Sequence, residues 1–126
     1  MPDLLQHPHG IPVLQCDPDG PPLRTEADAL DVVGSALHHG AHWVAVPAER
    51  FDDGFFQLRS RLAGEILQKF ANYRLGLAVI GDISRHLATG TALPDLIRES
   101  NRGHQAWFLP DAQALHDRLA PPPPGR

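Results

Sequence analysis

One short stretch narrows the possible folds more than any other, the apolar run LGLAVI at residues 75–80, which ends at Gly81 and Asp82. An apolar run without polar alternation is typical of a buried strand in a parallel sheet that is covered by helices. Parallel strands are joined by long crossover connections, so helices are expected before and after this strand.

Three further segments predict strands, because they are short and rich in β-branched, aromatic or small apolar residues. They span residues 11–16, 43–46 and 106–109. Pro12 directs the first of them toward an edge of the sheet, since proline cannot donate a hydrogen bond to a neighbouring strand. The sequence therefore predicts an α/β fold with a small, open, mostly parallel sheet of about four strands alternating with helices.

Helix caps and apolar spacing mark the connections between these strands. Thr25 caps a first helix, Asp28 completes a capping box, and Gly40 ends the helix in the left-handed conformation. A second helix is expected from a cap at Asp52 or Asp53 to about residue 72. It follows an apolar stripe of Phe55, Leu58, Leu62, Ile66 and Phe70.

Two more helices complete the alternation, one at residues 94–100 and one from a cap at Asp111 to about residue 119, while residues 83–92 fit either a loop or a short helix. With 126 residues the chain has room for one hydrophobic core. We expect an irregular segment with one edge strand at residues 1–24, a single α/β domain at residues 25–119, and a disordered proline-rich tail at residues 120–126.

Charge and composition exclude several classes of partner. The net charge is −4 and Lys69 is the only lysine, whereas a nucleic-acid surface needs concentrated basic residues. Cys16 is the only cysteine, so no intrachain disulfide is expected. The longest apolar run is too short to cross a bilayer and residues 1–10 lack the pattern of a secretory signal, so we expect a cytoplasmic location without membrane contact.

The eight histidines invite a metal hypothesis, but their spacing does not support one. His38, His39 and His42 run across a helix end and a glycine, so they do not share one helix face as metal-binding pairs do. The sequence also lacks a glycine-rich phosphate-binding fingerprint. We therefore expect no metal and no cofactor.

Two stretches, LAGEILQKFANYRLGLAVIGDIS at residues 62–84 and RESNRG at residues 98–103, resemble a small bacterial family, domain of unknown function 4180. The resemblance extends over residues 25–119. More remotely, the order of strand, acidic residues and helix is similar to the sulfate transporter and anti-sigma antagonist domain. That resemblance implies a phosphorylated serine at the start of the helix, but the matching residues here are Asp52, Asp53 and Gly54. They carry no hydroxyl, although two carboxylates could imitate the charge of phosphoserine.

Polar residues follow the predicted strands at the edge where ligands usually bind in such sheets. Asp52 and Asp53 come after one strand, and Asp82 and Ser84 after the next. These residues, with Asn101 and Arg102 at a helix exit, are the candidate binding residues. Each set also has a structural explanation, because Asp82 and Ser84 fit a turn cap and the helix exit fits a C-cap with solvated charges.

Three residues are candidates for acid–base chemistry. Glu65, Lys69 or Asp82 could act as a general base or its charged partner, and Gly64 before Glu65 fits a close backbone approach. The structural alternative is that Glu65 and Lys69, four residues apart on one helix, form an intrahelical ion pair.

Two functions remain open from the residues alone. The first is a non-catalytic regulatory or protein-interaction module, similar to the anti-sigma antagonist domain, that binds a protein partner. The second is a small cofactor-free enzyme, an isomerase, cyclase or lyase, that acts on a small acidic or carbonyl metabolite with Glu65 or Asp82 as the base. A homodimer is the default assembly in either case.

Overall fold

The computed structural model describes residues 3–57, 60–88 and 90–121. The described residues form one sheet of five strands. The strands lie side by side in the same order as they follow one another along the chain. The strands are β1 (Leu4–Gln6), β2 (Val13–Gln15), β3 (Trp43–Pro47), β4 (Gly76–Ile80) and β5 (Ala106–Leu109). β1 pairs antiparallel with β2, and the other neighbours run parallel. The prediction of an α/β fold is confirmed. The sheet is mixed, with five strands where about four were expected and one antiparallel pair, β1 with β2.

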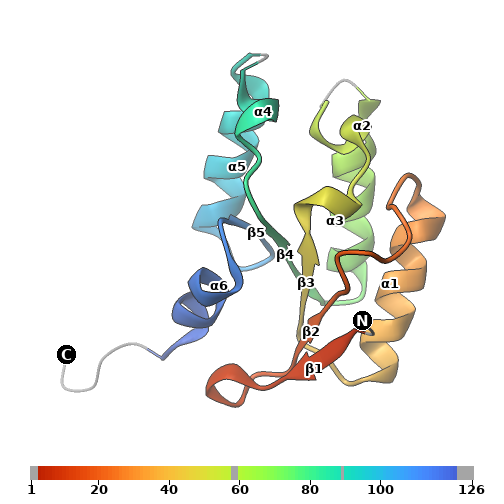
Figure 1. Ribbon diagram of the computed structural model, residues 1–126, viewed down its shortest axis with the longest axis vertical. Coiled ribbons are helices and arrows are strands. Elements are labelled where there is room, and N and C mark those ends of the chain that lie inside the picture. Colours follow the sequence, from red (N-terminus) through yellow and green to blue (C-terminus); the bar gives the residue numbers. More distant parts are fainter. Residues whose placement is uncertain (1–2, 58–59, 89, 122–126) are drawn as a thin grey trace.

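Helices connect the parallel strands, and α6 follows the last strand (Figure 1). They are α1 (Glu26–His38), α2 (Asp53–Phe56), α3 (Leu62–Asn72), α4 (Ser84–Leu87), α5 (Ala92–Arg102) and α6 (Ala112–Leu119), with the short turns η1 (Pro8–Gly10) and η2 (Ala48–Arg50). None of these helices is long and apolar enough to cross a membrane.

The order of the strands decides which face each helix covers. Every parallel connection moves one strand onward in the same direction, so right-handed crossovers put the connecting helices on one side of the sheet. The buried core agrees, because side chains of α1, α3 and α5 pack against one face and α6 packs against the other. The three-helix face presents Leu14, Val44, Val46, Leu77, Val79 and Phe108. The α6 face presents Val13, Trp43, Ala45, Ala78 and Trp107.

The α6 face depends on two tryptophan rings. Trp43 and Trp107 stack with ring centroids 4.0 Å apart and planes 23° apart. Trp43 lies across Gly76 of β4, where an added Cβ would come within 2.4 Å of the indole ring. Arg118 of α6 closes the stack, with its guanidinium carbon 4.4 Å from the Trp107 ring centroid. The stack of Trp43 on Trp107 therefore requires a glycine at position 76.

Several predicted helix ends are confirmed. The Thr25 side chain accepts from the Asp28 amide at 3.2 Å, and the Asp28 carboxylate accepts from the Thr25 amide at 3.1 Å, which completes the capping box. Gly40 follows α1 with φ of 70°. Asp111 caps α6 by accepting from the Ala114 amide at 2.8 Å.

The predicted second helix is wrong in its extent. Its apolar stripe is divided between α2 and α3, and Arg61 between them has a left-handed φ of 65°. Ser60 bridges the break, since its hydroxyl donates to the Gly54 carbonyl at 2.5 Å and accepts from the Leu62 amide at 3.2 Å. Leu58 of the predicted stripe lies outside the described residues.

The first 24 residues carry two strands where one edge strand was expected. β1 pairs outside β2, so β2 lies inside the sheet and the edge position predicted from Pro12 is wrong. Pro12 precedes the strand and needs no ladder donor there, while its carbonyl accepts from the His42 amide at 2.8 Å. Most of the tail predicted at residues 120–126 lies outside the described residues.

Candidate functional site

The predicted acidic residues at the carboxyl edge of the sheet serve first as turn and helix caps. Asp52 caps α2 by accepting from the Gly54 amide at 3.2 Å. Asp82 follows β4 and accepts from the Ser84 amide at 2.9 Å and from the Ser84 hydroxyl at 2.5 Å. These two bonds, the hydroxyl bond above all, lower the pKa of Asp82. Asp82 is thus held as a carboxylate and is a weaker base than an ordinary aspartate.

Two short helices that follow adjacent strands meet at this edge. Asp53 of α2 forms an ion pair with Arg85 of α4 at 3.2 Å, and both side chains are well exposed. Behind this pair, Phe56 stacks on His86 with ring centroids 4.0 Å apart and planes 14° apart. Partial burial and, to a smaller extent, Arg85 lower the pKa of His86, while Asp53 acts in the opposite direction. We call Asp53, Phe56, Arg85 and His86 the α2–α4 rim.

The intrahelical ion pair expected of Glu65 and Lys69 is wrong. Lys69 of α3 reaches across to α1 and pairs with Glu26 at 3.0 Å. Because α1 packs against α3, Lys69 reaches Glu26 of α1 and not Glu65 of its own helix. Glu65 is exposed, and no hydrogen bond or ion pair within the described residues links Glu65 or Lys69 to Asp82.

The candidate residues at the exit of α5 have different surroundings. The Asn101 side chain donates to the Phe108 carbonyl at 3.2 Å and accepts from the Phe108 amide at 2.8 Å. β5 is an edge strand, so Asn101 supplies the partner that a further strand would otherwise provide. Arg102 is exposed and forms an ion pair with Glu99 at 3.4 Å on the same helix.

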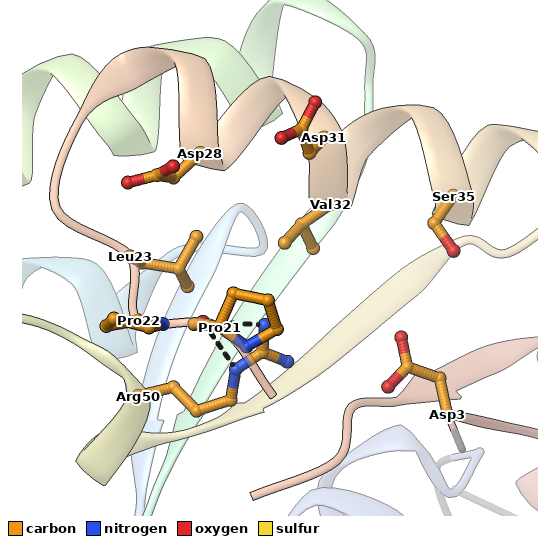
Figure 2. A pocket seen from close by; sticks show the side chains of 9 residues that line it. All are labelled: Asp3, Pro21, Pro22, Leu23, Asp28, Asp31, Val32, Ser35 and Arg50. Atoms are coloured by element: carbon orange, nitrogen blue, oxygen red, sulfur yellow. Dashed lines mark hydrogen bonds between the residues drawn. The ribbon is translucent and has the colours of Figure 1, made fainter. Parts of the chain in front are cut away.

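The sequence did not predict the pocket that lies between α1 and the loop after β2 (Figure 2). Its volume is about 170 Å³. It is lined by Asp3, Pro21, Pro22, Leu23, Asp28, Asp31, Val32, Ser35 and Arg50. No local motif marks these residues, because they come from the residue before β1, the loop, α1 and η2. The nearest signal in the sequence is that Arg50 stands four residues after the end of the buried strand predicted at residues 43–46.

Arg50 is the one charged residue that is buried in the described part of the chain, with 6% of its surface exposed. It donates from Nε and Nη2 to the Pro21 carbonyl at 3.1 and 2.9 Å. The backbone of Gly20 lies against the guanidinium, since an added Cβ there would meet its central carbon at 2.7 Å. The Leu23 amide bonds to the Arg50 carbonyl at 2.6 Å and fixes the loop to η2.

Cys16 lies beside this arginine and stays protonated. Burial first, and then the charge of Asp3, raise the pKa of the Cys16 thiol to about 12, although Arg50 acts in the opposite direction. A neutral thiol does not balance the charge of the guanidinium. Among the described residues, no three histidine, cysteine or carboxylate side chains are grouped so that they could hold a metal ion.

Comparison with known proteins gives a family and no function. No curated protein and no solved structure matches the chain. The family model described as domain of unknown function (DUF4180) matches residues 8–119, which is most of the 126 residues. The chain therefore belongs to the DUF4180 family.

Proposed function

We propose that this protein is a non-catalytic regulatory module of the cytoplasm that binds a protein partner through the α2–α4 rim. The observation that carries the proposal is the contact between Asp53 and Arg85, which joins two helices that leave adjacent parallel strands. Both helices stand at the carboxyl edge of the sheet, where function is usually placed in such folds. In Figure 1 both helices lie at the upper end of the molecule.

Aromatic contacts join the rim to the core, and its surface is charged. Phe56 is almost fully buried and contacts Phe51 and Phe55, so the stack on His86 ties α4 to the core. The charged ends of Asp53 and Arg85 remain open to solvent. Charges that are held in place but exposed contribute little to stability and fit the recognition of a charged partner.

Two further points favour binding over catalysis. The acid–base candidates are not assembled, because Asp82 is engaged by Ser84 and Lys69 by Glu26. Asp52 and Asp53 also open a helix after a central strand, where the anti-sigma antagonist domain has its switch serine. The proposed likeness to that domain would make the two carboxylates a permanently charged counterpart of the phosphorylated state.

A charge swap tests the proposal without removing the ion pair. Asp53→Arg combined with Arg85→Asp keeps the contact but reverses its polarity. Asp95→Arg with Arg98→Asp is the matched control, since that pair is also exposed and joined at 3.0 Å on α5. The measurement is affinity capture from the native host, followed by direct binding of each captured protein to the purified variants.

We expect one partner to bind the wild type and the control swap, and to lose at least tenfold in affinity for the rim swap. Equal binding to the rim swap and the wild type would contradict the proposal. Turnover of a metabolite by the purified protein, lost on Asp82→Asn, would favour the enzyme.

A further inference from the structure

The pocket beside α1 combines apolar walls with charges of both signs. Pro21, Pro22 and Leu23 of the loop and Val32 of α1 form the walls. Its volume of about 170 Å³ is several times the roughly 30 Å³ that one water occupies in the liquid. It is smaller than the roughly 300–1,000 Å³ of pockets for drug-sized ligands. The pocket therefore fits a small metabolite.

Arg50 brings a buried positive charge to this pocket, and no carboxylate of the described residues forms an ion pair with it. Two of its nitrogens donate to the Pro21 carbonyl, and the guanidinium also bonds to the neutral Cys16 thiol. The charge of Asp17 acts on Arg50 from farther away, without a direct ion pair. No carboxylate in the described residues lies within 4.0 Å of the guanidinium. Figure 2 shows the remaining terminal nitrogen, Nη1, directed away from Pro21 toward the side of Asp3. A buried charge that no carboxylate contacts directly is costly, so a ligand carboxylate in contact with Arg50 is favoured.

Carboxylates surround the rest of the pocket. Asp28 is occupied by the backbone amides of Arg24 and Thr25, which keep its pKa below the usual range and its charge in place. Asp3 accepts from the Asp17 amide through one oxygen only. Asp31 is exposed on α1 and has no hydrogen bond or ion pair among the described residues. These groups favour a positive charge on the ligand.

We propose that this pocket binds a small zwitterion of the α-amino-acid class, with its carboxylate on Arg50 and its ammonium group at Asp31 and Asp3. A ligand with only negative charge would meet three carboxylates, and a ligand with only positive charge would meet the guanidinium. A zwitterion satisfies both, and a short aliphatic side chain would pack against the proline and leucine walls. This site goes beyond the proposed rim and does not depend on it.

The test is to titrate the full chain with small-molecule probes. The readout is the backbone amide NMR signals of Leu23 and Val32. L-alanine and L-valine are the zwitterionic probes. Propionate and ethylamine each carry one of the two charges and are the matched probes. We expect the amino acids to shift these signals in a saturable way and to bind at least tenfold more tightly than either singly charged probe.

Two variants locate the site. Asp31→Asn removes an exposed carboxylate and should weaken L-alanine binding about tenfold. Glu65→Gln removes an exposed carboxylate on α3 and should leave binding unchanged. Arg50→Lys keeps the positive charge but loses the planar guanidinium fork. It should weaken L-alanine binding at least as much as Asp31→Asn does. If Arg50→Lys does not fold, L-alanine binding to Asp31→Asn decides the test.

Three results would overturn the inference. The first is the absence of any saturable shift with either amino acid. The second is equal affinity for propionate or ethylamine, which would make the pocket a simple anion or cation site. The third is unchanged binding of L-alanine to Asp31→Asn. Loss of partner binding in the rim swap with amino-acid binding intact would show that the two sites are separate.

Discussion

Side chains of α1, α3 and α5 pack on one face of the sheet, whereas those of α6 pack on the other. On the three-helix face, side chains such as Ile66 and Phe70 are fully buried between helix and sheet. On the α6 face, two tryptophan rings stacked over a glycine fill the space that further helices would occupy. The first face is thus built from helix packing and the second from the fit of a few large side chains.

The α6 face is also less complete in its hydrogen bonding. Two buried polar atoms in the described residues have no hydrogen-bond partner, Oε1 of Gln15 in β2 and Nε2 of His116 in α6. Buried polar atoms without partners cost free energy. The difference teaches that a single substitution disturbs the two faces in different ways: it leaves a cavity between helix and sheet on the three-helix face, and it separates the tryptophan stack on the α6 face.

The largest effect is expected on the three-helix face. Phe70→Ala removes a fully buried ring from α3 and should lower the free energy of unfolding by about 3–5 kcal/mol, because a cavity remains between helix and sheet. Tyr73→Ala is the control, since this side chain just beyond α3 is 49% exposed. It should change the free energy of unfolding by less than about 1 kcal/mol. Denaturant unfolding measures both, and equal effects would mean that α3 packs through another side.

The next effect tests the α6 face. Gly76→Ala puts a Cβ into the Trp43 ring, so the stack must separate or β4 must shift, at a cost of about 2–3 kcal/mol. The near-ultraviolet circular dichroism of the tryptophans should change with it. Gly64→Ala in α3 meets nothing within 4 Å and should stabilise by about 0.5–1 kcal/mol. A neutral Gly76→Ala would show that the tryptophans do not depend on that glycine.

The contrast between the faces explains how much of the fold could be predicted from the sequence. The strand at residues 106–109 and the caps at Thr25 and Asp111 were predicted correctly, because local spacing and capping chemistry determine them. The break at Arg61 was missed, since the apolar stripe continues through it and a left-handed arginine has no sequence signal. β1 was missed because three residues in a proline-rich start are too short to show a period.

The candidate site was harder to predict than the fold. The placement of Asp53 at the carboxyl edge followed from the alternation of strands and helices, but its partner Arg85 depends on how α2 and α4 meet. Arg50 looks like an ordinary surface arginine in the sequence. It is buried only because the loop with Gly20 and Pro21 folds over it from a distant part of the chain. Contacts of this kind are set by tertiary structure and leave no local pattern.

A third prediction concerns the edge where the two faces meet. Asn101→Ala leaves both backbone groups of Phe108 without their partner and should cost about 1–2 kcal/mol. Asn72→Ala is the control, because that amide bonds only to the Gln68 side chain at the surface. Hydrogen exchange should show faster exchange of the Phe108 amide in Asn101→Ala alone. Unchanged protection of that amide would mean that Asn101 does not close the edge.

The smallest expected effect separates two explanations of Lys69. Its side chain is 29% exposed and that of Glu26 is 42% exposed, so solvent screens their ion pair. A double-mutant cycle with Lys69→Met and Glu26→Gln should give a coupling free energy of about 0.2–1 kcal/mol. The same cycle with Glu65→Gln should give about zero, because Lys69 points to α1 and not along its own helix. Coupling to Glu65 instead would restore the intrahelical pair and remove the only ion pair that joins α1 to α3 in the described residues. The contact between α1 and α3 would then rest on apolar packing, whereas the α6 face keeps the charged contact of Arg118 with Trp107.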